Sequence, residues 1–232
     1  MPAADGAGEA ERPWFLVSGG SGGIGAAVCR ALAERGYLPI VGYRTGRAAA
    51  EVIAARCAGM ALRLDLRDEA EIVAAASELE RAPRLAGVIL AGSPPPALAP
   101  FGKLSRQELL EQLEVNVLGP QRLLAELVRR CFRKHKRGSV VGVLSRAMGD
   151  GSSGVASGMG AYVIAKHAMA GMLGLLAADY PWLHVRSVSP SYTETRMLDA
   201  FDARFLALQR ERAPFQTPEA IAALILDQAI IP

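Results

Sequence analysis

The stretch Ser18-Gly-Gly-Ser-Gly-Gly-Ile-Gly25 follows an apolar run, Trp14 to Val17, and leads into a helical stretch from Gly23 to Arg35. Glycines let a backbone turn sharply and come close to a ligand. The start of a helix presents free amide N–H groups and the positive end of the helix dipole, which together suit a phosphate. In the order strand, turn and helix, this stretch predicts a pyrophosphate site in a parallel α/β fold.

Outward from this turn, apolar runs alternate with amphipathic helical stretches. The expected strands are 14–17, 38–42, 60–64, 87–90, 139–144 and 184–188, and the expected helices are 23–35, 47–56, 69–81, 104–132 with a bend at 119–120, and 162–180. This alternation predicts a single Rossmann-type, doubly wound parallel sheet of about six strands with helices on both faces. Such a sheet binds its ligand beyond the carboxyl ends of its strands.

Length and composition fit one globular domain, which we place at 13–232. The net charge of +3 gives no reason to expect a nucleic-acid partner. Cys29, Cys57 and Cys131 show neither a metal-ligand nor a disulfide pattern, so we expect buried free thiols in a reducing cytoplasm. The three histidines are not spaced as a metal site, so no metal is expected.

The first residues, 1–12, are small, polar and acidic. A secretory signal would need basic residues followed by an apolar stretch, so we expect a flexible tail instead. No apolar run reaches the roughly 18 residues that a membrane span needs. The sequence therefore predicts a protein without a membrane partner.

Tyr162 and Lys166 stand four residues apart and would share one face of a helix. A phenol has an unperturbed pKa of about 10 and exchanges protons poorly at neutral pH. A neighbouring ammonium favours the phenolate, so we expect Lys166 to lower the pKa of Tyr162. The pair is a candidate proton-transfer device, and Ser145 and Asn116 lie upstream in the chain.

The end of the second strand indicates which nicotinamide cofactor is used. A carboxylate there would bind the ribose 2′-hydroxyl and repel a 2′-phosphate. The chain instead reads Gly42-Tyr-Arg-Thr45, with no acidic residue. Arg44 offers charge-assisted hydrogen bonds to a phosphate, Thr45 offers a hydroxyl, and Arg47 follows closely. This pattern favours NADP(H); the alternative is a solvated surface arginine.

Together these motifs resemble those of the classical short-chain dehydrogenase/reductase family, with its 3-oxoacyl reductases, from Trp14 to about Gln228. The turn at Ser18 to Gly25 stands where the family has Thr-Gly-x-x-x-Gly-x-Gly. The family's further motifs are matched by Asp65 after the third strand, Asn116, Ser145 after the fifth strand, Tyr162 with Lys166, and the stretch Pro190 to Thr195. The resemblance implies an oxidoreductase that uses a nicotinamide cofactor.

The resemblance also implies a role for each matched residue. Tyr162 would donate a proton to the carbonyl oxygen, and Ser145 would hydrogen-bond the same oxygen. Lys166 would lower the pKa of Tyr162 and bind the nicotinamide ribose, and Asn116 would help to hold a water relay behind it. The residues expected at the cofactor are Ser18, Gly19, Ser21, Gly23, Ile24, Gly25, Arg44, Thr45, Asp65, Leu66, Ala91, Gly92, Pro190, Thr193 and Thr195.

The chain departs from the family at several positions. Ile89-Leu-Ala-Gly92 replaces Asn-Asn-Ala-Gly, so the hydrogen bonds that stabilise the central sheet must be made differently. Ser191 replaces a glycine beside the nicotinamide. A long interval before the tyrosine makes Ser152 and Ser153 rivals of Ser145, which we favour because it directly follows a strand.

We expect a sheet without the family's usual C-terminal seventh strand. Its absence favours a homodimer, formed through the helices that begin at Leu104 and Tyr162, over a tetramer. Residues 196–213 carry apolar side chains at helical spacing, and their family position suggests a substrate lid; a helix packed on the core is the alternative. In either case we expect a substrate with a sizeable apolar part.

The sequence therefore predicts an NADPH-dependent enzyme that reduces a ketone or a 3-oxoacyl thioester to the alcohol. The basic run Arg129 to Arg137 is either a solvated helix end or a docking surface for an acidic carrier protein, but no second basic region occurs at Ala177 to Tyr180. The alternative function is that of a non-catalytic NADP(H)-binding subunit with a regulatory or partner role. The set of four catalytic residues favours the enzyme, and the altered Ile89-Leu90 segment favours the alternative.

Overall fold

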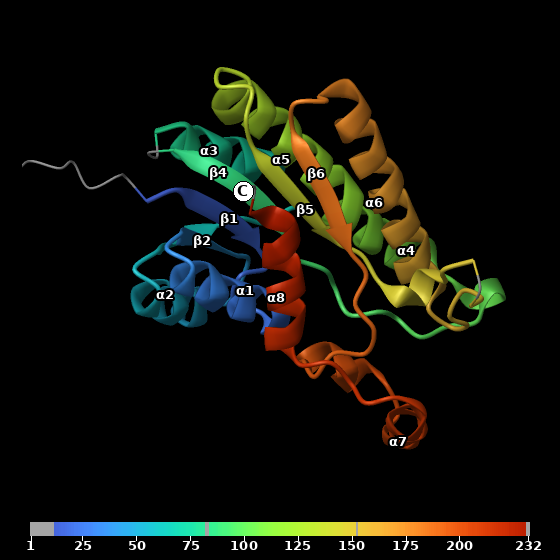
Figure 1. The fold of residues 1–232 in the computed structure, drawn as a ribbon. Coiled ribbons are helices and arrows are strands. Elements are labelled where there is room, and N and C mark those ends of the chain that lie inside the picture. Colours follow the sequence, from blue (N-terminus) through green and yellow to red (C-terminus); the bar gives the residue numbers. More distant parts are fainter. Residues whose placement is uncertain (1–11, 82–83, 152, 231–232) are drawn as a thin grey trace, which may run out of the picture.

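A computed structural model describes residues 12–81, 84–151 and 153–230. Six parallel strands form one sheet in the order β3-β2-β1-β4-β5-β6 (Figure 1). The strands are β1 (Trp14–Ser18), β2 (Leu38–Tyr43), β3 (Met60–Arg63), β4 (Leu85–Leu90), β5 (Ser139–Val143) and β6 (His184–Val188). The strand order reverses between β1 and β4, which confirms the predicted doubly wound sheet. The described residues contain no seventh strand.

Two layers of helices cover the sheet (Figure 1). One layer consists of α1 (Gly23–Glu34), α2 (Arg47–Arg56) and α8 (Pro218–Ala229); the other consists of α3 (Glu69–Arg81), α4 (Arg106–Leu113), η2 (Glu114–Leu118), α5 (Gly119–Leu127), η3 (Val128–Phe132) and α6 (Gly160–Asp179). Alternate residues of β1 serve the two cores. Phe15 and Val17 pack in the core of the first layer, and Leu16 packs in the core of the second.

The expected helix 104–132 forms, but its start was predicted wrongly and it is not regular throughout. Ser105 caps α4: its hydroxyl accepts a hydrogen bond from the Glu108 amide at 3.1 Å, and the Glu108 carboxylate accepts one from the Ser105 amide at 3.0 Å. This capping box starts the helix at Arg106 rather than at Leu104. The expected bend at Gly119-Pro120 coincides with a wider π-helical turn, η2, directly before it.

The region after β6 differs from the single amphipathic helix that its apolar spacing suggested. It divides into η5 (Arg196–Ala200) and α7 (Ala203–Arg212), because the Asp202 carboxylate caps α7 by accepting the amides of Arg204 and Phe205. Figure 1 shows α7 beyond the carboxyl ends of the strands, apart from both layers. Helix α8 was not predicted, although Thr217 followed by Pro218 is a helix-start signal, and the Thr217 hydroxyl caps it.

Of the described residues, only α6 forms a helix long and apolar enough to cross a membrane, with a mean hydropathy of 1.4. Its inner face is buried in the protein, where Tyr162, Lys166, Met169 and Leu173 are almost fully covered. The core helix of a globular fold passes the same test. The predicted tail, 1–12, lies outside the described residues except for Arg12, which hydrogen-bonds the carbonyl oxygens of Gly36 and Tyr37.

Candidate active site

Ser145, Tyr162 and Lys166 come together at the carboxyl edge of the sheet. Ser145 lies two residues beyond the end of β5, and the other two lie in the first turns of α6. The Ser145 side chain lies near enough to the Tyr162 phenol to influence the pKa of that phenol. The Lys166 ammonium lies 5.5 Å from the centre of the Tyr162 ring and donates a hydrogen bond to the Val143 carbonyl oxygen at 2.8 Å. Acid, orienting hydroxyl and cation thus occupy one small region.

Burial controls the protonation of this cluster. Tyr162 is 6% exposed, and its burial raises the pKa of its phenol above the usual value, although the Ser145 hydrogen bond acts in the opposite direction. Burial also lowers the pKa of Lys166 to about 7. Loss of water disfavours the charged form of both groups. Burial is thus the main influence on the pKa of Tyr162, and the expected lowering of that pKa by Lys166 stays a prediction.

The rival serines are placed differently. Ser153 is exposed, and both its amide and its hydroxyl donate to the Asp150 carboxylate, at 2.8 and 2.9 Å. Ser152 lies outside the described residues. The Ser145 hydroxyl accepts the Ala147 amide at 3.1 Å, which fixes its direction at the end of β5. Of Ser145 and Ser153, the structure brings only Ser145 to Tyr162.

Asn116 lies in the π-helical turn η2 and is 1% exposed. Its amide nitrogen donates to the Gln112 backbone oxygen at 2.9 Å and to the Gln112 side-chain oxygen at 3.1 Å. Its amide oxygen is buried and has no partner among the described residues. A buried acceptor of this kind usually binds a water or another donor, which suits the predicted water relay. Gln112 in turn donates to the Pro95 oxygen at 2.9 Å and holds the proline-rich loop.

The glycine-rich turn packs too closely for side chains. A Cβ on Gly25 would lie 2.2 Å from the Gly19 oxygen, and one on Gly19 would lie 2.6 Å from the Gly92 Cα. Helix α1 has no side-chain cap and no acidic residue in its first turn. Its first amide N–H groups therefore lack helical partners, and together with the dipole they fit a pyrophosphate. The predicted residues of this turn, from Gly19 to Gly25, lie at this helix start, and their contact with a cofactor stays a prediction.

Ser18 and Gly92 connect the two strands beside this turn. The Gly92 amide donates to the Ser18 hydroxyl oxygen at 3.3 Å, and Ser18 is 1% exposed. Ile89 and Leu90 are buried in the two opposite cores. The altered segment therefore joins the sheet by apolar packing, with the Ser18 hydroxyl supplying a hydrogen bond between strand ends. This side chain was predicted at the cofactor, but it faces the neighbouring loop.

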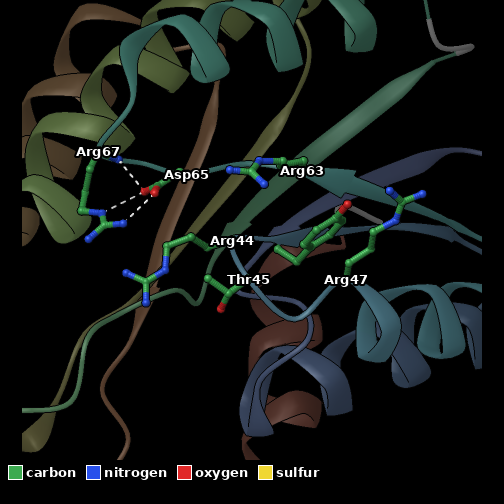
Figure 2. A pocket seen from close by; sticks show the side chains of 7 residues that line it. Arg44, Thr45, Arg47, Arg63, Asp65 and Arg67 are labelled. Atoms are coloured by element: carbon green, nitrogen blue, oxygen red, sulfur yellow. Dashed lines mark hydrogen bonds and ion pairs between the residues drawn. The ribbon is translucent and has the colours of Figure 1, made fainter.

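A cavity of about 610 Å³ opens at the ends of β2 and β3 (Figure 2). Its lining residues are Tyr43, Arg44, Thr45, Arg47, Arg63, Asp65 and Arg67. Arg47 pairs with Glu51 at 2.7 Å, and Arg63 pairs with Glu71 at 2.9 Å. Arg44 is the one arginine of this cavity that forms no ion pair with the described residues. Its exposed guanidinium extends into the opening in Figure 2.

Asp65 is engaged within its own loop. Its carboxylate accepts two hydrogen bonds from the Arg67 guanidinium, at 3.0 and 2.7 Å (Figure 2). The Arg67 hydrogen bonds are the main cause that lowers the pKa of Asp65, and Arg44 contributes through its charge. Asp65 lines the cavity. Because its carboxylate already accepts hydrogen bonds from Arg67, it would have fewer free acceptor positions for a cofactor. The next residue, Leu66, is buried in the core.

The stretch after β6 lies at the same carboxyl edge of the sheet as Ser145 and the glycine-rich turn. The Pro190 oxygen accepts the Arg146 amide at 2.8 Å, which connects this stretch to the Ser145 loop. The Thr193 hydroxyl donates to the Ser191 oxygen at 3.0 Å. A Cβ on Gly23 would lie 2.4 Å from the Thr195 Cγ2, so Thr195 packs on the glycine-rich turn. The predicted residues Pro190, Thr193 and Thr195 thus lie between the serine loop and the start of α1.

An aromatic cluster joins the segment after β6 to Tyr162. The Tyr192 ring lies 5.9 Å from Phe201, 6.1 Å from Phe205 and 5.2 Å from Phe215. Phe201 also packs on the small core that contains Tyr162. Sequence reasoning missed Tyr192, Phe215, Arg67 and Gln112. Only Arg67 carried a signal, because it stands two residues after a predicted acidic contact.

A Rossmann-type sheet with a Ser–Tyr–Lys cluster beside a glycine-rich helix start defines a dinucleotide-dependent class of protein. The model of the family described as short chain dehydrogenase matches residues 13–204. The chain therefore belongs to the short-chain dehydrogenase family, a family of oxidoreductases that use nicotinamide cofactors.

Three relatives illustrate the range of that family. The chain is 29% identical to 2,5-dichloro-2,5-cyclohexadiene-1,4-diol dehydrogenase of Sphingobium indicum, over 79% of this chain and 74% of the relative. It is 28% identical to the monensin polyketide synthase putative ketoacyl reductase of Streptomyces virginiae, over 90% and 87%. A solved gluconate 5-dehydrogenase from Burkholderia cenocepacia J2315 has the same fold, with a TM-score of 0.84 at 20% identity, over 94% of this chain and 88% of that one.

The geometry predicts different effects for the two described serines. Ser145→Ala removes a hydroxyl that is fixed beside Tyr162, and we expect turnover to fall by about 10²–10³, as for an oxyanion-hole donor. Ser153→Ala, the matched control, should cost far less, since its hydroxyl is bound to Asp150. Single-turnover consumption of the reduced cofactor with a carbonyl substrate measures both. A larger loss in the Ser153 variant would contradict the assignment of Ser145.

Proposed function

We propose that the protein is an NADPH-dependent reductase that converts a ketone or a 3-oxoacyl thioester to the alcohol. The observation that carries this proposal is the buried cluster at the carboxyl edge of the sheet, in which Ser145 and Lys166 both lie beside the Tyr162 side chain. A non-catalytic relative would have no need to keep two ionisable groups buried together. The intact cluster, with its shifted pKa values, is what an acid catalyst requires.

Each residue of the cluster has its own role in the transfer of a proton to the substrate. The nicotinamide cofactor, when bound, supplies the hydride. The raised pKa of Tyr162 keeps its phenol protonated at neutral pH, which is the form that donates a proton to a carbonyl oxygen. Ser145 orients that phenol and offers a hydrogen bond to the same oxygen, where negative charge develops. Lys166, with a pKa of about 7, is charged in a large fraction of molecules and stabilises the phenolate that remains.

The preference for NADPH rests on Arg44. Among the arginines around the cavity at the ends of β2 and β3, it is the one without an ion pair to the described residues. A free guanidinium can bind the 2′-phosphate of NADPH through two hydrogen bonds. Arg47 and Arg63 already have carboxylate partners and would add long-range attraction. Asp65 does not oppose the phosphate strongly, because Arg67 neutralises it.

The substrate class follows from the apolar surroundings of Tyr162. The cluster around Tyr192 and Phe201 borders the catalytic side, so the proposed lid, 196–213, offers aromatic surface to an apolar substrate body. A ketoacyl reductase among the relatives is consistent with an acyl substrate. The basic run Arg129 to Arg137 precedes β5, at the opposite end of that strand from Ser145. This position gives a carrier protein no direct route to Tyr162 in the same chain.

The proposal extends to assembly and location. The outward side of α6 presents Ile164 and Leu175, which are 41% and 63% exposed, and α4 packs beside α6. These helices suit the predicted homodimer, because an exposed apolar helix face favours association. The thiols of Cys29, Cys57 and Cys131 are free, as a reducing cytoplasm would keep them.

The cofactor preference can be tested at Arg44. Arg44→Ala should weaken NADPH binding by about 10-fold or more while NADH binding changes little, because charge-assisted hydrogen bonds contribute about 1.5–3 kcal/mol. Arg56→Ala, an exposed arginine at the end of α2, controls for net charge. Fluorescence titration of the unmodified protein and both variants with NADPH and NADH measures all six affinities. Equal affinities of the unmodified protein for NADPH and NADH would contradict the assignment.

The proposed reaction can be tested by following NADPH absorbance against a panel of ketones and 3-oxoacyl thioesters. We expect turnover of at least one apolar carbonyl compound, and faster turnover with NADPH than with NADH. Tight NADPH binding without turnover across the panel would instead favour the non-catalytic, NADP(H)-binding subunit.

A further inference from the structure

A second cavity, of about 770 Å³, lies at the amino edge of the sheet, where β1, β4 and β5 begin. Leu85 and Ser139 line it from the first residues of β4 and β5, and Phe15 lines it from the second residue of β1. This edge is opposite to the carboxyl edge, which carries Ser145 and Tyr162. Figure 1 shows α7 beyond the carboxyl edge. Its volume lies within the range of small-molecule sites, about 300–1,000 Å³. We call it the amino-edge cavity.

The rim of the amino-edge cavity is strongly basic. Arg84, Lys134 and Arg137 line it, and none of them forms an ion pair with the described residues. Arg130 also lines it, but Glu80 and Glu126 bind its guanidinium at 2.7 and 2.8 Å. Glu80 is the one acidic lining residue, and it is committed to Arg130. Three exposed cations thus line one cavity, and the described residues of its lining offer no unpaired carboxylate to balance them.

The floor of the cavity contains a polar group without a partner. Ser139 is 1% exposed, and its hydroxyl oxygen has no hydrogen-bond partner among the described residues. A buried hydroxyl without a partner is unfavourable and is uncommon in folded proteins. A ligand oxygen in the cavity would supply the missing partner. The rim and the floor are independent observations: the basic rim indicates an anionic ligand, and the Ser139 hydroxyl indicates that a polar atom of that ligand reaches the floor.

The number of donors identifies the class of anion. A carboxylate has a single charge and two oxygens, whereas a phosphate ester has about two charges and three free oxygens. Two guanidiniums, one ammonium and one hydroxyl match the phosphate better. We propose that the amino-edge cavity binds the phosphate group of a small organic molecule, with Arg84, Lys134 and Arg137 around the phosphate and Ser139 beneath it. This site is separate from the proposed cofactor site and does not depend on it.

Calorimetric titration of the full chain with inorganic phosphate and with glucose 6-phosphate, at constant ionic strength, tests the proposal. Glucose is the uncharged control. We expect saturable binding of glucose 6-phosphate, tighter than that of inorganic phosphate, and none of glucose. Arg84→Ala and Arg137→Ala should each weaken the binding of glucose 6-phosphate by about 10-fold or more. Arg133→Ala, an exposed arginine of the same run that does not line the cavity, should leave it unchanged.

Two further variants make the outcome decisive. Arg44→Ala should not alter the titration; if it abolishes binding, the phosphate occupies the cofactor cavity and the proposal is overturned. Ser139→Ala should fold with an unchanged or higher thermal unfolding midpoint, because the variant lacks the unpartnered hydroxyl. Glucose 6-phosphate should raise the midpoint of this variant less than it raises that of the unmodified protein. Absence of saturable binding to the unmodified protein, or an equal loss in the Arg133 variant, would also overturn it.

Discussion

Close contact between the glycine-rich turn and the loop after β4 is the constraint on which the remaining structure depends. Gly19 approaches Gly92 so closely that a Cβ would lie 2.6 Å from the Gly92 Cα, and the Gly92 amide hydrogen-bonds Ser18. These contacts hold together the ends of β1 and β4, where the strand order reverses. Because α1 starts from the same turn, its free amide groups face the opening between the two strands. A side chain at Gly19 would push the glycine-rich turn away from the loop after β4.

Burial gives the cluster its chemical character. Tyr162 and Lys166 lie in the first turns of α6, a helix that is buried along its inner side. Loss of water raises the pKa of Tyr162 and lowers the pKa of Lys166, so it favours the neutral form of each side chain. The Tyr162 phenol is therefore protonated at neutral pH, the form that can donate a proton, whereas Lys166, with a pKa of about 7, can exchange a proton near neutral pH. The protein thus keeps the acid ready, while the charge that would stabilise its conjugate base is within reach at 5.5 Å from the ring.

The sequence predicted most of the fold because its patterns are local. Helices α2 and α3 have the predicted bounds, and the glycine-rich turn, Ser145 and Tyr162 follow from strand and helix positions in a parallel sheet. Properties that depend on contacts between distant segments were not accessible. The burial that shifts the pKa of Lys166 and the aromatic contacts of Tyr192 arise only when the chain has folded. The Asp65–Arg67 pair is local in sequence, but its geometry depends on side-chain rotamers that no pattern specifies.

The most direct test of the account is the rate of cofactor oxidation in Tyr162→Phe after rapid mixing of the NADPH-loaded protein with a carbonyl substrate. The account predicts unchanged NADPH affinity, because the ring still packs on Met159 and Val163. It also predicts a rate about 10²–10⁴ times lower, the usual contribution of a positioned acid. A rate close to that of the unmodified protein would show that the proton comes from another group and would contradict the central claim.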